Sequence, residues 1–148
     1  MALVVASVCG AGYSPVASGT VGSLAAAIAL WLIPFTRVSL VATTVAVTVI
    51  GTWAAWRVER ATGRKDPGLI VIDEVAGMFL SVLLLPRTLS VLATAFLLFR
   101  ALDIWKPFPC REAQALAGGL GVMLDDVIAG VYALILILGS RMLFGLPA

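Results

Sequence analysis

The sequence predicts an all-α integral membrane bundle of about four or five spanning helices, preceded by an N-terminal interfacial or re-entrant segment. Of the 148 residues, 61% are hydrophobic and only 12% are charged, and the mean hydropathy is +1.10. A soluble domain carries about 25% charged residues, and a chain of this length cannot bury so much apolar surface in one soluble core. Apolar runs near spanning length also alternate with short polar connections.

The expected elements follow from where these runs begin and end. Residues 1–20 are interrupted by Gly, Ser and Pro, so they cannot form a membrane-spanning helix. We expect them to form the interfacial or re-entrant segment. Residues 21–35 form a short apolar run that ends near Pro34. This run can cross the bilayer only if the helix tilts or if upstream residues lengthen it. About 20 mostly apolar residues cross a bilayer, which residues 38–56 satisfy outright. Three further runs qualify if their charges face the protein interior: 69–85, 89–105 and 120–138.

Short connections predict that neighbouring helices are antiparallel within a single domain over residues 1–148. The basic residues then orient this bundle, because Lys and Arg are enriched in cytoplasmic loops. One face carries two basic loops, 57–68 and 106–119, which contain Arg57, Arg60, Arg64, Lys65, Lys106 and Arg111. The opposite face carries only Arg37, Arg87 and Arg141. We therefore predict that the first face is cytoplasmic.

Six of the eight acidic residues lie within or beside the most apolar runs: Asp66, Asp73, Glu74, Asp103, Asp125 and Asp126. A charged side chain at the centre of a spanning helix costs about 2.5–3.5 kcal/mol on insertion scales. At a rise of about 1.5 Å per residue, all but Asp66 lie within about 10 Å of the cytoplasmic ends of three predicted helices. We expect these carboxylates, together with Arg100, to converge at one site.

A cluster this rich in carboxylates repels itself at neutral pH unless a cation neutralises it. The chain has no histidine, and Cys9 and Cys110 lack the spacing of a metal site. Ligands that are oxygen atoms alone favour Mg²⁺ or Mn²⁺. The alternative interpretation is a buried structural network in which the acids pair with Lys65, Arg100 or Lys106.

Those three basic residues border the predicted acid cluster and are suited to bind a phosphate group. The Gly-rich turn at residues 18–24 leads into a helix, whose first N–H groups could bind an anion, although Ser18 or Thr20 could equally be an ordinary N-cap. Carboxylates, a metal and a basic clamp favour hydrolysis of a lipid phosphate by metal-activated water. A cysteine phosphatase is excluded because no arginine stands six positions after Cys110.

Four segments, in order and with matching spacing, resemble the phosphatidylglycerophosphatase A family: GAGYSPVASGTVGSL (10–24), DPGLIVIDEVAGMF (66–79), FRALDIWKPFPCRE (99–112) and GGLGVMLDDVIAGVYA (118–133). The resemblance covers residues from about 10 to about 138. It implies an all-helical enzyme of the bacterial inner membrane, which the apolar runs and basic loops predict to be multi-pass with its active site facing the cytoplasm. It also implies Mg²⁺-dependent removal of the terminal phosphate of phosphatidylglycerophosphate, which gives phosphatidylglycerol.

The resemblance also assigns roles to residues of this chain. The expected catalytic residues are Asp73, Glu74, Arg100, Asp103 and Asp126. The expected ligands of one or two Mg²⁺ ions are Asp73, Glu74, Asp103, Asp125 and Asp126. The expected substrate-binding residues are Thr20, Asp66, Arg100 and Lys106 from the family motifs, together with Lys65 from the basic rim. Some family members carry histidines near positions 66–68 and 117–118, and this chain has none, so the general base is a carboxylate or the metal-activated water. Attack on the phosphate by a carboxylate, instead of by water, remains an alternative mechanism.

An ion-coupled transporter or channel subunit is the alternative function, because charged residues inside a membrane also mark ion paths. Transporters place such charges near the bilayer midplane, often in internally repeated halves. Here the charges gather near one surface beside a basic rim, and no internal repeat is apparent. The net charge of +2 is too small to indicate a nucleic-acid partner. The preferred partner is the lipid phosphate.

Overall fold

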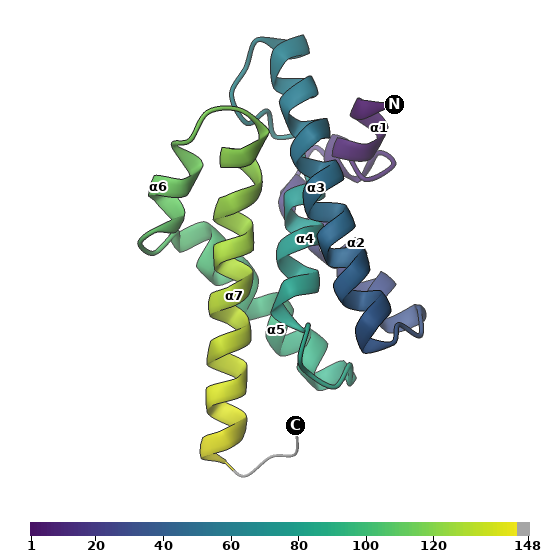
Figure 1. Cartoon of the computed structure of the whole chain (residues 1–148), viewed down its shortest axis with the longest axis vertical. Helices are drawn as coiled ribbons and strands as arrows, with labels where there is room; N and C mark the ends of the chain where they lie inside the picture. Colours follow the sequence, from purple (N-terminus) through teal and green to yellow (C-terminus); the bar gives the residue numbers. More distant parts are fainter. Residues whose placement is uncertain (145–148) are drawn as a thin grey trace.

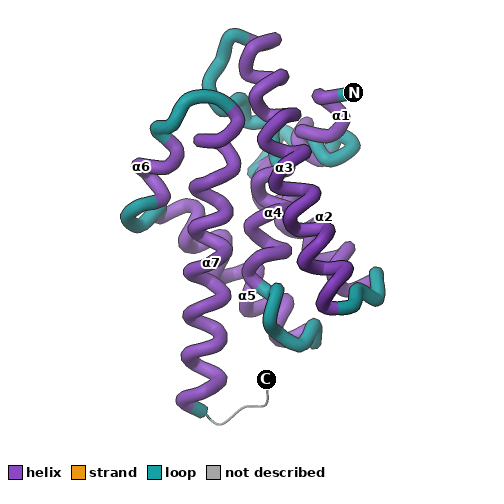
Figure 2. Tube along the Cα trace, in the orientation of Figure 1, coloured by secondary structure: helices purple, strands orange, loops and turns teal. Residues whose placement is uncertain are grey.

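The computed structural model describes residues 1–144, which form helices joined by loops, with no strand in that range (Figure 2). The elements are α1 (Ala2–Ala6), the 3₁₀ turn η1 (Ala11–Tyr13), α2 (Ser18–Leu32), α3 (Arg37–Thr62), α4 (Ile72–Ser81), α5 (Leu89–Trp105), α6 (Cys110–Gln114) and α7 (Gly119–Leu143). The prediction of an all-helical fold is confirmed.

Helix α4 is the centre of the molecule. It packs against α2, α3, α5 and α7, which surround it (Figure 1). Nine of its ten residues are buried, the apolar ones and also Asp73, Glu74 and Ser81. Asp73 and Glu74 occupy its first turn. The two acids that interrupt this apolar run therefore lie inside the bundle.

Two glycines allow α4 and α7 to approach closely. A Cβ atom added to Gly130 on α7 would overlap the carbonyl oxygen of Gly77 on α4. A Cβ atom on Gly77 would in turn overlap the ring of Phe99 and lie 2.7 Å from the carbonyl oxygen of Asp126. Small residues permit such contact between helix backbones. The contact brings the acidic end of α7 against the acidic first turn of α4.

Helices α3 and α7 are the two described helices that are long and apolar enough to cross a membrane. They run antiparallel to each other (Figure 1). The hydroxyl groups of Thr44, Thr48 and Thr52 on α3 donate to carbonyl oxygens four residues earlier, at 2.7–2.8 Å. These bonds satisfy three polar groups in the apolar middle of the helix.

The other predicted spans correspond to shorter helices. Helix α2 has 15 residues, α5 has 17 and α4 only 10. Ten residues extend about 15 Å, roughly half of a hydrocarbon core of about 30 Å. The total of four or five spans therefore stays a prediction.

The N-terminal segment packs against α3 and against the loop that leads into α4. The backbone N–H of Val71 donates to the carbonyl oxygen of Ala6 at 2.9 Å, and Gly12 lies directly against the carbonyl oxygen of Leu69. The hydroxyl of Ser18 donates to the carbonyl oxygen of Gly68 at 2.7 Å. Residues far apart in sequence thereby fix the start of α4 and its two acids.

The opposite end of the bundle is held by an aromatic and cationic contact. The guanidinium of Arg87 donates to the carbonyl oxygen of Phe35 and lies 5.9 Å from the centroid of its ring. Phe35 packs edge-on against Phe79, with ring centroids 5.7 Å apart. This contact joins the α2–α3 connection to the α4–α5 connection.

Candidate active site

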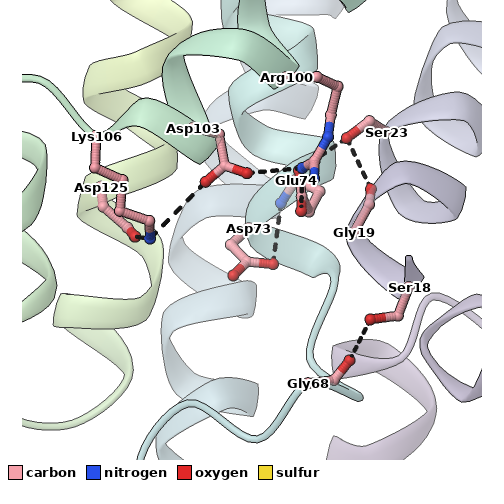
Figure 3. Close-up of polar contacts among 10 residues, drawn as sticks. All are labelled: Ser18, Gly19, Ser23, Gly68, Asp73, Glu74, Arg100, Asp103, Lys106 and Asp125. Atoms are coloured by element: carbon pink, nitrogen blue, oxygen red, sulfur yellow. Dashed lines mark hydrogen bonds and ion pairs between the residues drawn. The ribbon is translucent and has the colours of Figure 1, made fainter. Parts of the chain in front are cut away.

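The six acids singled out in the sequence surround one cavity of about 250 Å³. Glu74 and its neighbour Asp73 come from α4, Asp103 from the end of α5 and Asp125 from the start of α7 (Figure 3). Asp126 follows Asp125 on α7. Asp66, in the loop before α4, completes the set. The first turn of α2 contributes Ser18 and Gly19. The structure thus brings together the three segments that the sequence predicted would converge.

Arg100 joins two of these carboxylates through a single nitrogen. Its Nη1 lies 2.5 Å from both carboxylate oxygens of Glu74 and 2.8 Å from Oδ2 of Asp103. The spacing of three residues places Arg100 and Asp103 on the same face of α5. Within residues 1–144 its Nη2 makes no hydrogen bond, and its buried Nε has no partner. Part of the guanidinium is therefore left to bind another group.

Lys106 lies between Asp125 of α7 and Asp103 of α5. Its Nζ lies 2.5 Å from Oδ2 of Asp125 and 3.9 Å from Oδ1 of Asp103. Lys106 follows the last residue of α5 in a left-handed conformation, with φ of 49°, and Pro107 comes next. Burial opposes its charge, but the hydrogen bond and charge of Asp125 outweigh burial and raise the pKa of Lys106. The lysine therefore remains cationic at neutral pH.

Two of the carboxylates are buried without a counter-charge. Asp73 is 8% exposed and Asp126 is 3% exposed, and no Lys or Arg in the described part of the chain lies within ion-pair distance of either. Asp73 accepts a hydrogen bond from the backbone N–H of Glu74 at 3.0 Å. Buried charges are normally paired or coordinate metals. Six acids here face two cations, Arg100 and Lys106.

The donor atoms fit a hard divalent cation. Glu74, Asp103 and Asp126 each offer an oxygen atom, and these three atoms lie within 4.8 Å of one another. Asp125 lines the same cavity, and its buried Oδ1 has no hydrogen-bond partner among the described residues. Oxygen-only donors are the ligands that Mg²⁺ prefers. Asp73, the fifth expected ligand, borders the same space.

Two residues on α2 belong to the site although the sequence reasoning did not assign them roles. The hydroxyl of Ser23 lies 2.8 Å from Oε2 of Glu74 and 2.9 Å from the carbonyl oxygen of Gly19. A Cβ atom on Gly19 would overlap Oε1 of Glu74. Gly19 was noted only as part of a possible anion-binding turn. Ser23 lies near the start of an apolar run. A serine hydroxyl in such a position usually bonds only to the backbone of its own helix, so the sequence did not indicate its contact with Glu74.

The remaining predicted substrate-binding residues lie around the rim. Asp66 accepts a hydrogen bond from Gln114 at 3.1 Å and borders both the acidic cavity and a neighbouring cavity of about 460 Å³. Lys65 and Arg111 line the neighbouring cavity instead of the acidic one. Thr20 is half-buried beside Gly19 and does not line the acidic cavity.

Comparison with known proteins assigns the chain to a family. The family model for phosphatidylglycerophosphatase A matches residues 4–141. A protein of Bacteroides thetaiotaomicron provisionally named a phosphatidylinositol-3-phosphatase is 43% identical, with 92% of this chain and 91% of the relative covered. Phosphatidylglycerophosphatase A of Escherichia coli strain K12 is 38% identical over 82% of this chain and 73% of the relative.

The phosphatidylglycerophosphatase A of Haemophilus influenzae is 35% identical over 86% of this chain and 81% of the relative. No solved structure matches the chain. The match of the family model includes every residue that lines the acidic cavity. This chain belongs to the phosphatidylglycerophosphatase A family.

Proposed function

We propose that this protein is a membrane-embedded lipid phosphatase that hydrolyses the terminal phosphate of phosphatidylglycerophosphate to give phosphatidylglycerol and inorganic phosphate. Family membership supports the substrate. The observation that carries the proposal is the single cavity lined by six carboxylates and Lys106, with Arg100 bound to two of those carboxylates. Carboxylates beside a basic clamp are the parts that metal-dependent phosphoryl transfer needs.

Glu74, Asp103 and Asp126 would hold Mg²⁺, with Asp73 and Asp125 beside them. A bound Mg²⁺ supplies positive charge that polarises a phosphoryl oxygen and lowers the pKa of water. The rest of the site consists of this chain's own groups. The two ion pairs hold the carboxylates in place against their mutual repulsion. Without histidine, a carboxylate of the cavity is the group that accepts a proton.

Arg100 and Lys106 would bind the phosphate. Arg100 binds its two carboxylates through Nη1, so its Nη2 can donate to a phosphate oxygen. Lys106 contributes a point charge on the other side of Asp103. The first turn of α2, at Ser18 and Gly19, borders the same cavity, and N–H groups at a helix start favour an anion.

We propose that the protein is multi-pass in the bacterial inner membrane, with this site at the cytoplasmic surface. Helices α3 and α7 satisfy the requirements of length and hydropathy for crossing. The basic loops follow α3 and precede α7, at the end of the bundle that holds the acidic cavity (Figure 1). Basic loops are typical of the cytoplasmic side.

Phosphatidylinositol 3-phosphate is the second candidate substrate, because the relative at 43% identity carries a name for that activity. Both lipids present a phosphomonoester on a headgroup that also carries free hydroxyl groups, one in phosphatidylglycerophosphate and several in the inositol lipid. The neighbouring cavity lined by Lys65, Asp66 and Arg111 could accept headgroup hydroxyls of either one. The transporter alternative gains no support from the comparisons.

The test is phosphate release by the purified protein in detergent micelles containing Mg²⁺. The panel contains phosphatidylglycerophosphate, phosphatidylinositol 3-phosphate and phosphatidic acid at equal surface concentration. The proposal predicts the highest kcat/KM for phosphatidylglycerophosphate. Faster hydrolysis of phosphatidylinositol 3-phosphate would reassign the substrate. Absence of release from all three lipids by folded protein would contradict the phosphatase proposal.

A further inference from the structure

We propose that the apolar groove between α2 and α5 holds one acyl chain of the lipid whose phosphate lies in the acidic cavity, an inference that rests on the proposed function. The groove has a volume of about 410 Å³. All of its lining residues are apolar, and they include Leu24, Ile28 and Trp31 on α2 and Leu92, Ala93 and Phe96 on α5. Acyl chains need such a surface, whereas the acidic cavity is lined mainly by polar and charged residues.

The groove and the acidic cavity are lined by different residues of the same two helices, α2 and α5. Leu24 directly follows Ser23, whose hydroxyl contacts Glu74. Phe96 lies four residues before Arg100, about 6 Å along α5. The two helices that form the groove therefore also deliver Ser23 and Arg100 to the carboxylate of Glu74 (Figure 3). A headgroup in the cavity would place the start of its acyl chain at this end of the groove.

The length of the groove fits one acyl chain. Its far end is formed by Leu32 on α2 and Leu89 on α5. Leu32 comes nine residues after Ser23, and Leu89 comes eleven residues before Arg100. At 1.5 Å per residue, these separations are about 14–17 Å. One leaflet occupies half of a hydrocarbon core of about 30 Å, so the groove has the depth of one leaflet.

Small side chains keep the groove open. Ala27 and Ala93 lie among larger lining residues such as Ile28, Trp31 and Phe96. Ile28 is 50% exposed and Trp31 is 52% exposed, so the groove opens at the surface of the bundle. Other exposed apolar residues, such as Val45 and Val49 on α3, line none of the cavities described above. The hollow shape of the groove, and its position on the two helices that carry Ser23 and Arg100, distinguish it from a surface that merely faces bulk lipid.

Filling the groove tests the proposal. Ala93→Phe places a ring where the acyl chain would lie, and Ala46→Phe makes the same change at an exposed position of α3. We would compare kcat/KM for long-chain phosphatidylglycerophosphate with kcat/KM for its deacylated, water-soluble headgroup. The ratio should fall at least about tenfold in Ala93→Phe and stay at the wild-type value in Ala46→Phe. An unchanged ratio in a folded Ala93→Phe variant would overturn the groove assignment.

Photolabelling of the wild-type protein gives a second readout that needs neither turnover nor a variant. The probe is phosphatidic acid with a diazirine at the end of one acyl chain, in nanodiscs of phosphatidylcholine. Labels should map to α2 and α5 and should decline with excess phosphatidylglycerophosphate, whereas labels on α3 should not. Uniform labelling that excess lipid does not reduce would mean that the groove contacts only bulk lipid. Crosslinks between two copies of the protein at the groove would assign the groove to a protein–protein interface. Either result would reject the acyl-chain site.

The two proposals can fail separately. If the wild-type protein releases no phosphate from any lipid but its groove labels competitively, the phosphatase proposal fails and the lipid site stands. If phosphate is released while neither the ratio nor the labelling responds as expected, the groove assignment fails and the phosphatase proposal stands.

Discussion

Arg100 contacts both of its carboxylate partners through Nη1 alone. A purely structural ion pair would need no more than this one nitrogen. The rest of the guanidinium includes a buried Nε that has no partner among residues 1–144. The planar fork of arginine can bind a carboxylate and a phosphate at once, which a lysine ammonium on its flexible stem cannot reproduce.

Arg100→Lys should therefore lower kcat/KM for phosphatidylglycerophosphate at least about tenfold, equivalent to about 1.4 kcal/mol of transition-state binding. Lysine keeps the charge that pairs with Glu74 and Asp103 but lacks a second donor nitrogen for the phosphate. Kinetics in matched micelles, with thermal unfolding as a control for stability, would measure the effect. Efficiency within about twofold of wild type would assign Arg100 to structure alone.

Asp126 is the buried carboxylate that completes the three-oxygen cluster with Glu74 and Asp103. Asp126→Asn should reduce kcat at least about a hundredfold, or about 2.7 kcal/mol, because it removes a charged ligand. Asp73→Asn should also lose most turnover. The folded state should be retained or stabilised, since removing one charge relieves repulsion. Glu112→Gln, at an exposed acid of α6, is the control. Near-normal rates in both Asn variants would place the site elsewhere.

The two cysteines should be dispensable for turnover. Cys9 is exposed and Cys110 is buried, and both are free. Burial, reinforced by the charge of Asp125, raises the pKa of the Cys110 thiol, so it stays protonated and weakly nucleophilic at neutral pH. A Cys9→Ser, Cys110→Ala variant should keep its kcat for phosphatidylglycerophosphate. A large loss of kcat in a normally folded variant would reopen thiol chemistry.

At the scale of elements, the contact between α4 and α7 depends on two glycines. Gly130→Ala should destabilise the fold by about 1–3 kcal/mol, because the added methyl group overlaps the backbone of α4 at Gly77. Gly139→Ala is the matched control on the same helix, since nothing lies within 4 Å of its added Cβ. Thermal unfolding in detergent would compare them. Equal midpoints for both variants would contradict the close packing of α4 and α7.

Apolar length and helix-stopping residues allowed some elements to be predicted closely. The run at 89–105 matches α5 (Leu89–Trp105), which ends two residues before Pro107. The prediction of one helix over residues 69–85 was wrong in extent, because α4 begins at Ile72 and ends at Ser81. The preceding loop is held by Ala6 and Ser18, and hydropathy within one run contains no information about such distant contacts.

The site was predictable to the extent that charge in an apolar run is conspicuous. Glu74, Asp103 and Asp126 could be found because each interrupts a hydrophobic segment. Gly19 and Ser23 could not be assigned, since their contacts with Glu74 arise only when α2 packs against α4. Lys65 was expected at the phosphate site and lines the neighbouring cavity instead, because a loop residue has no helical register to fix its direction.

For the whole molecule, charge is distributed unevenly along the bundle axis. Six carboxylates and Lys106 line one cavity, Arg100 binds two of those carboxylates, and basic loops surround that end. The opposite end is closed by the contact of Arg87 with Phe35. This polarity suits an enzyme that takes a charged headgroup at a membrane surface while its apolar helices accommodate the acyl chains.

The central claim is that the excess of carboxylates holds a divalent cation that hydrolysis requires. The most direct measurement is phosphate release from phosphatidylglycerophosphate by the wild-type protein in EDTA, followed by titration with Mg²⁺. The account predicts no release in the chelator and full recovery as Mg²⁺ exceeds it, because oxygen-only ligands bind this ion reversibly. Full activity in EDTA would contradict the claim and leave the six acids a purely structural network.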